Sequence, residues 1–373
     1  MRILKIFALN CGVLSNISID FTVDDKPQKL ICLSGVNGSG KTTIMELIIA
    51  LASFLNPQLS INNIFFDRLK PNILIRTEFA QLDILINNKI LSLVFGDEKH
   101  VQDNNNYPQS FIIINNEIKS IIQKFEDFFV KEPVDKKDGR INIELDDLKG
   151  FFLDKEVIPQ KIIKKNFELF ESLLKNIEKN IYKELDQSTS CELPHFYLFN
   201  AHDREIQDIR YSSIPKDDSK YQIVYRYNPQ NDDLKKLLIF YDYAYNEEFR
   251  SLTEWVNKNV LIGKKIEGIY RPDFMVIIKT DKGYEHGLEL LSSGEESLLI
   301  IAIQLYLNAS KNAVMMIDEI DQSLHPEFQE KIMRIIIQLQ KEKKCQIIIS
   351  SHSVNIWKAF KEESIIRLTE VIM

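Results

Sequence analysis

The sequence is poor in cysteine, tryptophan and histidine, and it holds no long apolar run. Its 373 residues include four cysteines, two tryptophans and six histidines. No cysteines form a C-x-x-C pair, and Cys32 and Cys345 lie inside apolar runs, so we expect buried thiols rather than disulfides or metal ligands. The longest apolar run, Leu298–Leu307, has about half the length that a membrane crossing requires.

Several functional signatures are also missing. The first residues, MRILKIFALN, lack the apolar stretch and the small-residue cleavage site of a signal peptide, so we expect a cytoplasmic protein that does not enter a membrane. H-E-x-x-H, G-x-S-x-G, an EF-hand loop and metal-spaced Cys/His clusters are absent from the sequence. The net charge of −7 argues against general nucleic-acid binding, although it leaves room for a local basic groove.

One stretch carries a complete phosphate-binding pattern. Leu30–Leu33 has the character of a buried strand, GVNGSGKT follows at Gly35–Thr42, and an apolar-periodic helix comes next. This is the P-loop spacing G-x-x-x-x-G-K-[ST] in its strand–loop–helix context. Glycines let successive N–H groups turn toward an anion, and the helix start adds positive potential. We expect Lys41 to reach the β- and γ-phosphates and Thr42 to bind Mg²⁺. The predicted nucleotide-binding residues of the loop are Asn37, Gly38, Ser39, Gly40, Lys41, Thr42 and Thr43.

The chain divides into three predicted domains. Residues 1–96 form an N-terminal ATPase lobe with the P-loop, residues 97–190 a helical insertion, and residues 191–373 a C-terminal ATPase lobe. Apolar residues over 163–181 alternate by four and three, which fits either an inserted helical hairpin or helices packed on the globular core. The strands expected in the first lobe are Ile3–Leu9, Ile17–Phe21, Ile73–Phe79, Leu82–Ile86 and Ile90–Phe95. In the second lobe we expect an exposed strand at Tyr221–Tyr227, helices at Leu234–Tyr245 and Asn246–Val260, two strands in Ile266–Thr280 and a last strand at Ile365–Met373.

A second candidate anion site lies at LSSGE, Leu291–Glu295, before a helix that is apolar on nearly all sides. Ser292 can donate its hydroxyl to a phosphate, and Gly294 allows close backbone approach. The same residues equally suit an ordinary helix start with acidic residues in its first turn. By itself, this stretch leaves both interpretations open.

Catalytic side chains are predicted at the ends of two buried strands. Val314–Ile317 is followed by Asp318 and Glu319, and ligands bind at such carboxyl ends in open α/β sheets. Asp318 is placed to hold Mg²⁺, directly or through water, and Glu319 to polarise an attacking water. Gln346–Ile349 leads to His352, which we expect to reach a γ-phosphate. The competing interpretation makes one carboxylate a turn cap and His352 a structural histidine.

In this order, the P-loop, LSSGE, MMIDE and SSH resemble ABC-type ATPases of the SMC, RecF and OLD kind. They are similar in particular to the compact prokaryotic AAA family ATPases of phage-defence operons. The resemblance covers residues 1–96 and 260–373. It implies an α/β fold, namely an ABC-type P-loop NTPase head with a mixed sheet and an inserted mainly helical subdomain. The motifs it implies are Walker A at 35–42, the signature at 291–295, Walker B at 314–319, the D-loop at Ser323–His325 and the switch histidine His352.

The resemblance also implies an activity, the hydrolysis of ATP to ADP and phosphate with ATP and Mg²⁺ bound. Two protomers would sandwich two ATP molecules, possibly within a higher oligomer, with Ser292, Ser293 and Gly294 of one copy facing the P-loop of the other. Glu319 and His352 would be catalytic. We expect a sensor or regulator of a separately encoded effector, a nuclease or toxin, in anti-phage defence. The alternatives are a DNA-tethering or repair ATPase of the RecF/SMC type, which would bind nucleic acid, and a transporter ATPase subunit.

The sequence departs from these relatives at a few positions. Ser293 and Glu295 replace the Gly and Gln common in transporter signatures, and Ile320 replaces the usual Pro after Walker B. Gln81 and Gln109 are both candidates for the Q-loop glutamine. FNAHDR, which ends at Arg204, resembles a strand-end motif of the defence ATPases but indicates no role for the arginine. Because only a short segment follows His352, we expect no TOPRIM nuclease domain of the OLD kind.

Overall fold

The computed structural model describes residues 1–55, 73–74, 76–86, 88–103, 106–114, 116, 195–201, 204, 206, 224–229 and 233–368. The chain divides into two compact units. Unit 1 comprises Met1–Pro27, Asn37–Leu193 and Leu368–Met373, and unit 2 comprises Gln28–Val36 and Pro194–Arg367. Strands pair both parallel and antiparallel, and helices pack on them, which confirms the mixed α/β fold predicted for an ABC-type ATPase head. The predicted helical insertion lies almost wholly outside the described residues.

Unit 1 is built on a five-stranded sheet with the order β2-β1-β6-β7-β8. β1 pairs antiparallel with β2 and β6, β6 pairs antiparallel with β7, and β7 pairs parallel with β8. In β2 every apolar residue is buried and every polar one exposed, the alternation of a strand with one face on the core. The strands are β1 (Arg2–Cys11), β2 (Leu14–Asp20), β6 (Phe79–Ile86), β7 (Lys89–Phe95) and β8 (Gln109–Ile114), with a short ribbon of β3 (Thr22–Val23) and β4 (Lys26–Pro27) beside them.

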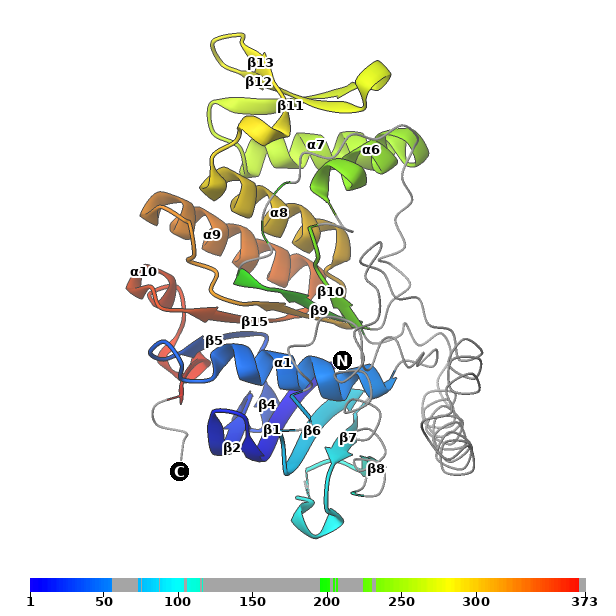
Figure 1. Ribbon diagram of the computed structural model, residues 1–373, viewed down its shortest axis with the longest axis vertical. Coiled ribbons are helices and arrows are strands. Elements are labelled where there is room, and N and C mark those ends of the chain that lie inside the picture. The colour runs from blue at the N-terminus through cyan, green and yellow to red at the C-terminus, as the bar shows by residue number, and fades with distance from the viewer. Residues whose placement is uncertain are drawn as a thin grey trace, which may run out of the picture. The chain divides into compact units, whose positions relative to one another are not determined.

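The predicted P-loop helix is present as α1 (Lys41–Ala52), followed by the 3-10 turn η1 (Ser53–Leu55). In Figure 1 it runs along the sheet of unit 1, and it contacts β6 and β7. Gly40 precedes the helix with a left-handed φ of 91°, and a Cβ there would overlap the side chain of Leu14. Glycine is therefore required at the start of α1 for both backbone and packing reasons.

Two expectations for unit 1 need correction. The predicted strand Ile73–Phe79 is a turn over its first part, closed by the Thr77 hydroxyl, which donates to the Ile73 carbonyl oxygen at 2.7 Å. β6 then runs without a break from Phe79 to Ile86. β8 was not predicted, and it extends the N-terminal sheet beyond residue 96 because it pairs along the whole length of β7. The division into three domains stays a prediction.

Unit 2 is built on a six-stranded sheet with the order β10-β9-β14-β15-β5-β16, in which all pairings are parallel. Every residue of β14 and β15 is buried, as expected of parallel strands covered on both faces. Because the strands run in one direction, their carboxyl ends meet at one edge of the sheet. The strands are β5 (Leu30–Ser34), β9 (His195–Phe199), β10 (Val224–Arg226), β14 (Ala313–Ile317), β15 (Gln346–Ser351) and β16 (Ile365–Arg367).

Helices cover the sheet of unit 2 in successive layers. In Figure 1, α8 and α9 lie on the sheet, α6 and α7 lie beyond α8, and a three-stranded antiparallel sheet packs on α6 and α7. Cys32 and Cys345 are buried in this core, as predicted. The helices are α6 (Leu234–Ala244), α7 (Asn246–Asn259), α8 (Ser293–Asn308), α9 (Pro326–Lys343) and α10 (Val354–Trp357), and the small sheet comprises β11 (Lys264–Tyr270), β12 (Met275–Thr280) and β13 (Glu285–His286).

The helices of unit 2 match the predictions, but one strand prediction differs. The strand expected to be exposed at Tyr221–Tyr227 is described from Val224, and there Tyr225 and Tyr227 are buried. The two strands predicted in Ile266–Thr280 are present as β11 and β12, which pair with each other and, through β12, with β13. The last predicted strand is present as β16, which ends at Arg367, and the part of the predicted range after Leu368 lies outside the described residues.

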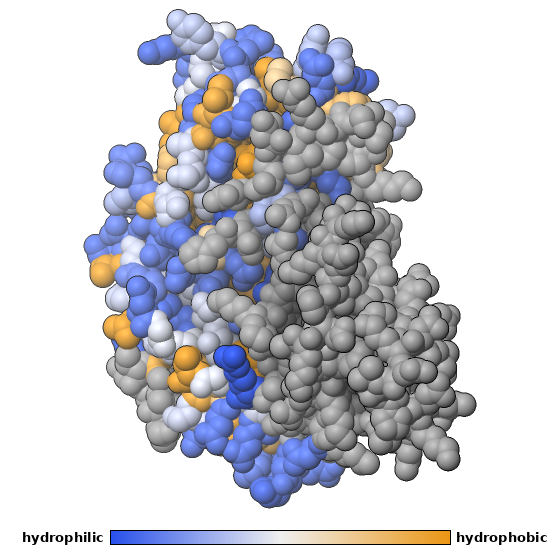
Figure 2. All heavy atoms as spheres, viewed as in Figure 1, coloured by the Kyte–Doolittle hydropathy of each residue, from blue (hydrophilic) through white to orange (hydrophobic). Residues whose placement is uncertain are grey.

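The described residues on the face shown in Figure 2 are mainly hydrophilic. On the face in Figure 2, hydrophobic residues lie interspersed among hydrophilic ones over the coloured atoms. Within the described ranges, each helix is either too short or too polar to cross a bilayer.

Candidate functional site

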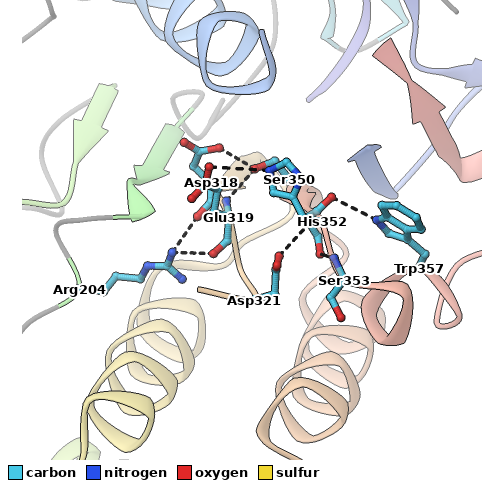
Figure 3. A network of polar contacts seen from close by, with 9 residues as sticks. Arg204, Asp318, Glu319, Asp321, Ser350, His352, Ser353 and Trp357 are labelled. Carbon is cyan, nitrogen blue, oxygen red and sulfur yellow. Dashed lines mark hydrogen bonds and ion pairs between the residues drawn. The ribbon is translucent and has the colours of Figure 1, made fainter. Parts of the chain in front are cut away.

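The carboxyl ends of β14 and β15 bring three of the predicted site residues together (Figure 3). Ser350 joins the two strand ends, because its hydroxyl donates to Asp318 Oδ1 at 2.5 Å and accepts from the Glu319 amide at 2.7 Å. Asp318 is buried, whereas the Glu319 side chain is 33% exposed. One serine therefore fixes the positions of both acidic residues, and the glutamate keeps contact with solvent.

Glu319 has an unusual backbone conformation. Its φ of 44° is left-handed, a region that residues with a Cβ rarely adopt. The chain turns back at this point, where the Ile320 amide donates to the Ser350 carbonyl oxygen at 3.0 Å and the Gln322 amide to the Glu319 carbonyl oxygen at 2.9 Å. Strained conformations of this kind cluster at functional sites. The turn sets the direction in which the glutamate side chain leaves the sheet edge.

His352 lies beside this glutamate. Its Nε2 is 3.9 Å from Glu319 Oε1, and its amide donates to Asp321 Oδ1 at 3.2 Å. The first distance is too long for a hydrogen bond. In the part of the chain that the structure describes, the buried Nε2 has no other hydrogen-bond partner. The ring nitrogen is therefore available to a ligand, which supports the functional interpretation of His352 over the structural one.

Arg204 is a member of this cluster that sequence reasoning left without a role. Its Nη2 donates to the carbonyl oxygens of Asp318 and Glu319, at 2.8 Å each, and its Nε donates to the Asn200 carbonyl oxygen at 3.1 Å. Burial lowers the pKa of Arg204 to about 10, and the carboxylates of Asp318, Asp321 and Glu319 act in the opposite direction. The guanidinium is therefore charged at neutral pH. The sequence signals were its place shortly after β9 and the resemblance of FNAHDR to a strand-end motif, which indicated no role.

The signature stretch forms a complete helix cap. Ser292 is the N-cap of α8: its hydroxyl accepts from the Glu295 amide at 3.4 Å, and its own amide donates to Glu295 Oε2 at 2.9 Å. Lys264 of β11 lies 2.8 Å from Glu295 Oε1. Burial raises the pKa of Glu295, but the hydrogen bonds from Lys264 and Ser292 outweigh it, so the pKa lies below its ordinary value. The structure shows the capping role, and the phosphate-binding role stays a prediction.

Gly294 has a packing role inside unit 2. A Cβ there would lie 2.9 Å from the Ser323 carbonyl oxygen and 3.2 Å from the Phe328 ring. The missing side chain therefore lets α8 approach the loop that follows β14. Ser292 and Ser293, by contrast, are exposed.

The P-loop joins β5 of unit 2 to α1 of unit 1. Gly38 and Gly40 both have left-handed φ, at 78° and 91°, which explains the glycines of the pattern. Lys41 and Ser39 are buried, Thr42 and Thr43 are half-buried, and Asn37 is exposed. The P-loop lysine and threonine belong to unit 1, and the acidic residues and His352 belong to unit 2. Their convergence on one nucleotide therefore stays a prediction.

The residues fit the predicted magnesium ion. Across the described ranges, no group of three or more His, Cys, Asp and Glu side chains forms a metal cluster. Mg²⁺ commonly takes only one or two protein ligands and completes its shell with water and phosphate oxygens. Asp318, buried at the strand end, and Thr42, after the P-loop lysine, match that pattern in residue type.

The two Q-loop candidates lie in a polar network of unit 1. Gln81 Nε2 donates to Asp83 Oδ1 at 2.9 Å, and Gln109 Nε2 donates to the Ser92 hydroxyl at 2.7 Å. Ser92 in turn donates to Asp83 Oδ1 at 2.6 Å. Burial raises the pKa of Asp83, although these hydrogen bonds and the charge of Lys5 oppose it. Both glutamines thus have internal partners, and neither is singled out as a Q-loop residue.

Comparison with known proteins bears on this site. Residues 30–357 match the AAA_21 family, described as "AAA domain, putative AbiEii toxin, Type IV TA system". No curated protein matches the chain.

Three solved structures are similar to it, each over 96% of this chain. The SMC head domain from Thermotoga maritima is 13% identical over 92% of its own length, with a TM-score of 0.38. The Smc head domain from Pyrococcus furiosus, with an extended coiled coil and bound to the C-terminal domain of ScpA, is 14% identical over 91%, with a TM-score of 0.41. An Smc head bound to the C-winged helix domain of ScpA is 12% identical over 92%, with a TM-score of 0.42. From the span of the family match, which includes the P-loop, the signature, both acidic residues and His352, the chain belongs to the AAA_21 family of AAA domains.

Proposed function

We propose that this chain is a magnesium-dependent ATPase whose heads close as a dimer around ATP and thereby control a separately encoded effector protein. The observation that carries the proposal is the cluster of Asp318, Glu319 and His352 at the edge of a parallel sheet, in a chain that also has a P-loop. The AAA_21 family match supports nucleotide binding.

In the proposed reaction Glu319 acts as the general base. Its carboxylate is partly exposed, so it can accept a proton from a water that attacks the γ-phosphate. His352 Nε2, unpaired among the described side chains, is the group that would donate to the γ-phosphate. Lys41 would bind the β- and γ-phosphates, and Thr42 and Asp318 would hold Mg²⁺, which neutralises the phosphate oxygens when bound.

The dimer part of the proposal rests on the signature helix. Ser292 and Ser293 are exposed at the N-terminus of α8, a 16-residue helix whose positive end favours anions. A glutamate at this end would repel a phosphate, but Lys264 pairs with Glu295 at 2.8 Å and compensates its charge. Ser292, Ser293 and Gly294 are therefore suited to meet the nucleotide held by a second copy.

The effector part is supported by the family description, which concerns a toxin and a Type IV toxin–antitoxin system. We infer a co-encoded nuclease or toxin as the partner and anti-phage defence as the setting. The ATP-bound and ATP-free heads would present different surfaces to that partner.

The central test is the solution mass of the Glu319→Gln protein. With ATP and Mg²⁺ it should bind nucleotide, hydrolyse it only at a low residual rate and elute at twice the 43.6 kDa of one chain, whereas the Lys41→Ala protein should bind no nucleotide and stay monomeric. A Glu319→Gln protein that stays monomeric with saturating ATP would overturn the dimer. Failure of the trapped dimer to capture any neighbouring gene product, together with tight salt-dependent binding to duplex DNA, would favour a DNA-tethering ATPase instead.

A further inference from the structure

We propose that Arg204 is a positioning residue for ATP hydrolysis, which holds the main chain of Glu319 in the turn that aims its carboxylate. The inference rests on the proposed function and deepens it. The strand-end motif that FNAHDR resembles indicates no role for the arginine, and 115 positions separate it from Glu319.

The contact is with the main chain rather than with side chains. Nη2 bridges the carbonyl oxygens of Asp318 and Glu319 at equal distances of 2.8 Å. In an extended strand successive carbonyl groups point in opposite directions, so one nitrogen cannot reach both. They converge here because the chain leaves the strand at Glu319, with its φ of 44°. The arginine thus recognises the turned conformation and stabilises it with charge-assisted hydrogen bonds.

Glu319 is held from two sides. Ser350 accepts the hydrogen bond of its amide at 2.7 Å, and Arg204 donates to its carbonyl oxygen. A residue with a Cβ is strained in the left-handed region, so the turn requires such support. Without the arginine, we expect the segment to relax and the carboxylate to swing away from the attacking water.

The burial of Arg204 argues against a role that is limited to stabilising the fold. Arg204 is only 5% exposed, and within the described ranges no carboxylate lies within ion-pair distance of it. Its Nη1 finds no acceptor there either. The cost of burying the charge offsets part of what its hydrogen bonds contribute to stability. Its contacts serve the geometry of the turn.

The first experiment compares Arg204→Met, which removes the donors but keeps the length, with Arg204→Lys. For Arg204→Met we expect a kcat about 100-fold below wild type, the scale of a misplaced catalytic group, with KM and the affinity for a non-hydrolysable ATP analogue unchanged. Arg204→Lys should recover part of the rate, because an ammonium can still donate to both carbonyl oxygens. Arg334→Met is the matched control, since Arg334 is 77% exposed and pairs with Glu330 on the surface of α9; it should behave as wild type.

The second experiment asks whether Arg204 acts through Glu319. In a Glu319→Gln background, adding Arg204→Met should lower the residual rate no further, because the group that the arginine positions is already gone. An equal loss in both backgrounds, or a raised KM at constant kcat, would overturn the proposal. If Arg204→Met does not fold, as judged by circular dichroism, the same comparison is made with Arg204→Lys. Wild-type protein without ATP hydrolysis would overturn the proposed function and this role together, whereas active wild type with an equally active Arg204→Met protein would overturn this role alone.

Discussion

The Ser350 hydroxyl donates a 2.5 Å hydrogen bond to Asp318 Oδ1, across the ends of two neighbouring parallel strands. The same oxygen accepts from the amide of Glu319. A hydroxyl has one hydrogen to give and two lone pairs to accept with, so a single serine orients a predicted metal ligand and the main chain of the predicted base.

Replacement of Ser350 should lower both the stability of the fold and the kcat, whereas replacement of the neighbouring Ser351 should lower stability alone. Ser350→Ala leaves a buried amide without its acceptor, so we expect a loss of about 1–3 kcal/mol in the free energy of unfolding and a kcat reduced at least about tenfold. Ser351→Ala is the control, because its hydroxyl, on the same strand, accepts from the Ser353 amide at 2.9 Å and, among the described residues, contacts neither acidic residue. It should lose stability on the same scale and keep its kcat. Equal activity in both variants, measured by phosphate release, would contradict the coupling.

The pair of Lys264 and Glu295 predicts a rescue. Lys264→Met leaves the Glu295 charge uncompensated beside Ser292, so we expect the ATP-dependent dimer to weaken by up to about fivefold, the scale of one charge at a helix start. Glu295→Gln in the same chain should restore it. Lys265→Met is the control, since that lysine pairs with Glu267 in an exposed position on the same strand. Dimer dissociation constants from analytical ultracentrifugation decide the outcome, and a double variant as weak as Lys264→Met alone would refute the charge argument.

Asp83 predicts a pH dependence of stability. Burial raises its pKa in the folded state above the ordinary 3.8, so the unfolded chain loses its proton first as the pH rises. The free energy of unfolding therefore falls from about pH 4 upward until the folded pKa is passed. Asp83→Asn should remove this slope and become relatively more stable toward pH 7. Asp97→Asn is the control. Lys99 lowers the pKa of that exposed carboxyl, so the pH dependence of stability that this substitution removes has the opposite sign. Urea melts from pH 4 to 7 that show identical slopes for wild type and Asp83→Asn would rule this out.

Gly294 predicts a steric cost at the signature. Gly294→Ala places a Cβ 2.9 Å from a main-chain oxygen, that of Ser323, which cannot move as a flexible side chain would. We expect a loss of about 1–3 kcal/mol in stability, the usual cost of overpacking. Ser293→Ala, one position earlier and exposed, should leave the melting temperature unchanged. A Gly294→Ala protein as stable as wild type would show that α8 does not need this close approach.

The parts of the fold that sequence reasoning predicted are those with a local cause. β5, α1, β14 and β15 follow from short apolar runs and from the P-loop spacing, which depend only on neighbouring residues. Ile73–Phe79 has the same apolar character, but its described residues before Phe79 include a turn, across which the Thr77 hydroxyl donates to the Ile73 carbonyl oxygen. β8 owes its pairing to β7 along its whole length, a long-range contact that its own composition does not reveal.

The site residues also divide into those that sequence reasoning predicted and those that it missed. Asp318, Glu319 and His352 were predicted from their places at strand ends, where side chains of parallel strands meet. Arg204 and Lys264 were not assigned, since their partners lie far along the chain and are partly main-chain atoms. Every residue has a carbonyl oxygen, so the pattern of residue types cannot show which of these oxygens a side chain will bind.

The partners of Arg204 in the turn are main-chain atoms, which relatives of this chain also have. Every amino acid has the carbonyl oxygens that Arg204 binds, so a homologue that has lost its acidic residues can keep the arginine and the shape of the turn. Such a protein would bind nucleotide in a properly folded but inactive site. The arginine alone therefore indicates that the turn is present. Only the arginine together with the glutamate distinguishes active ATPases from inactive homologues.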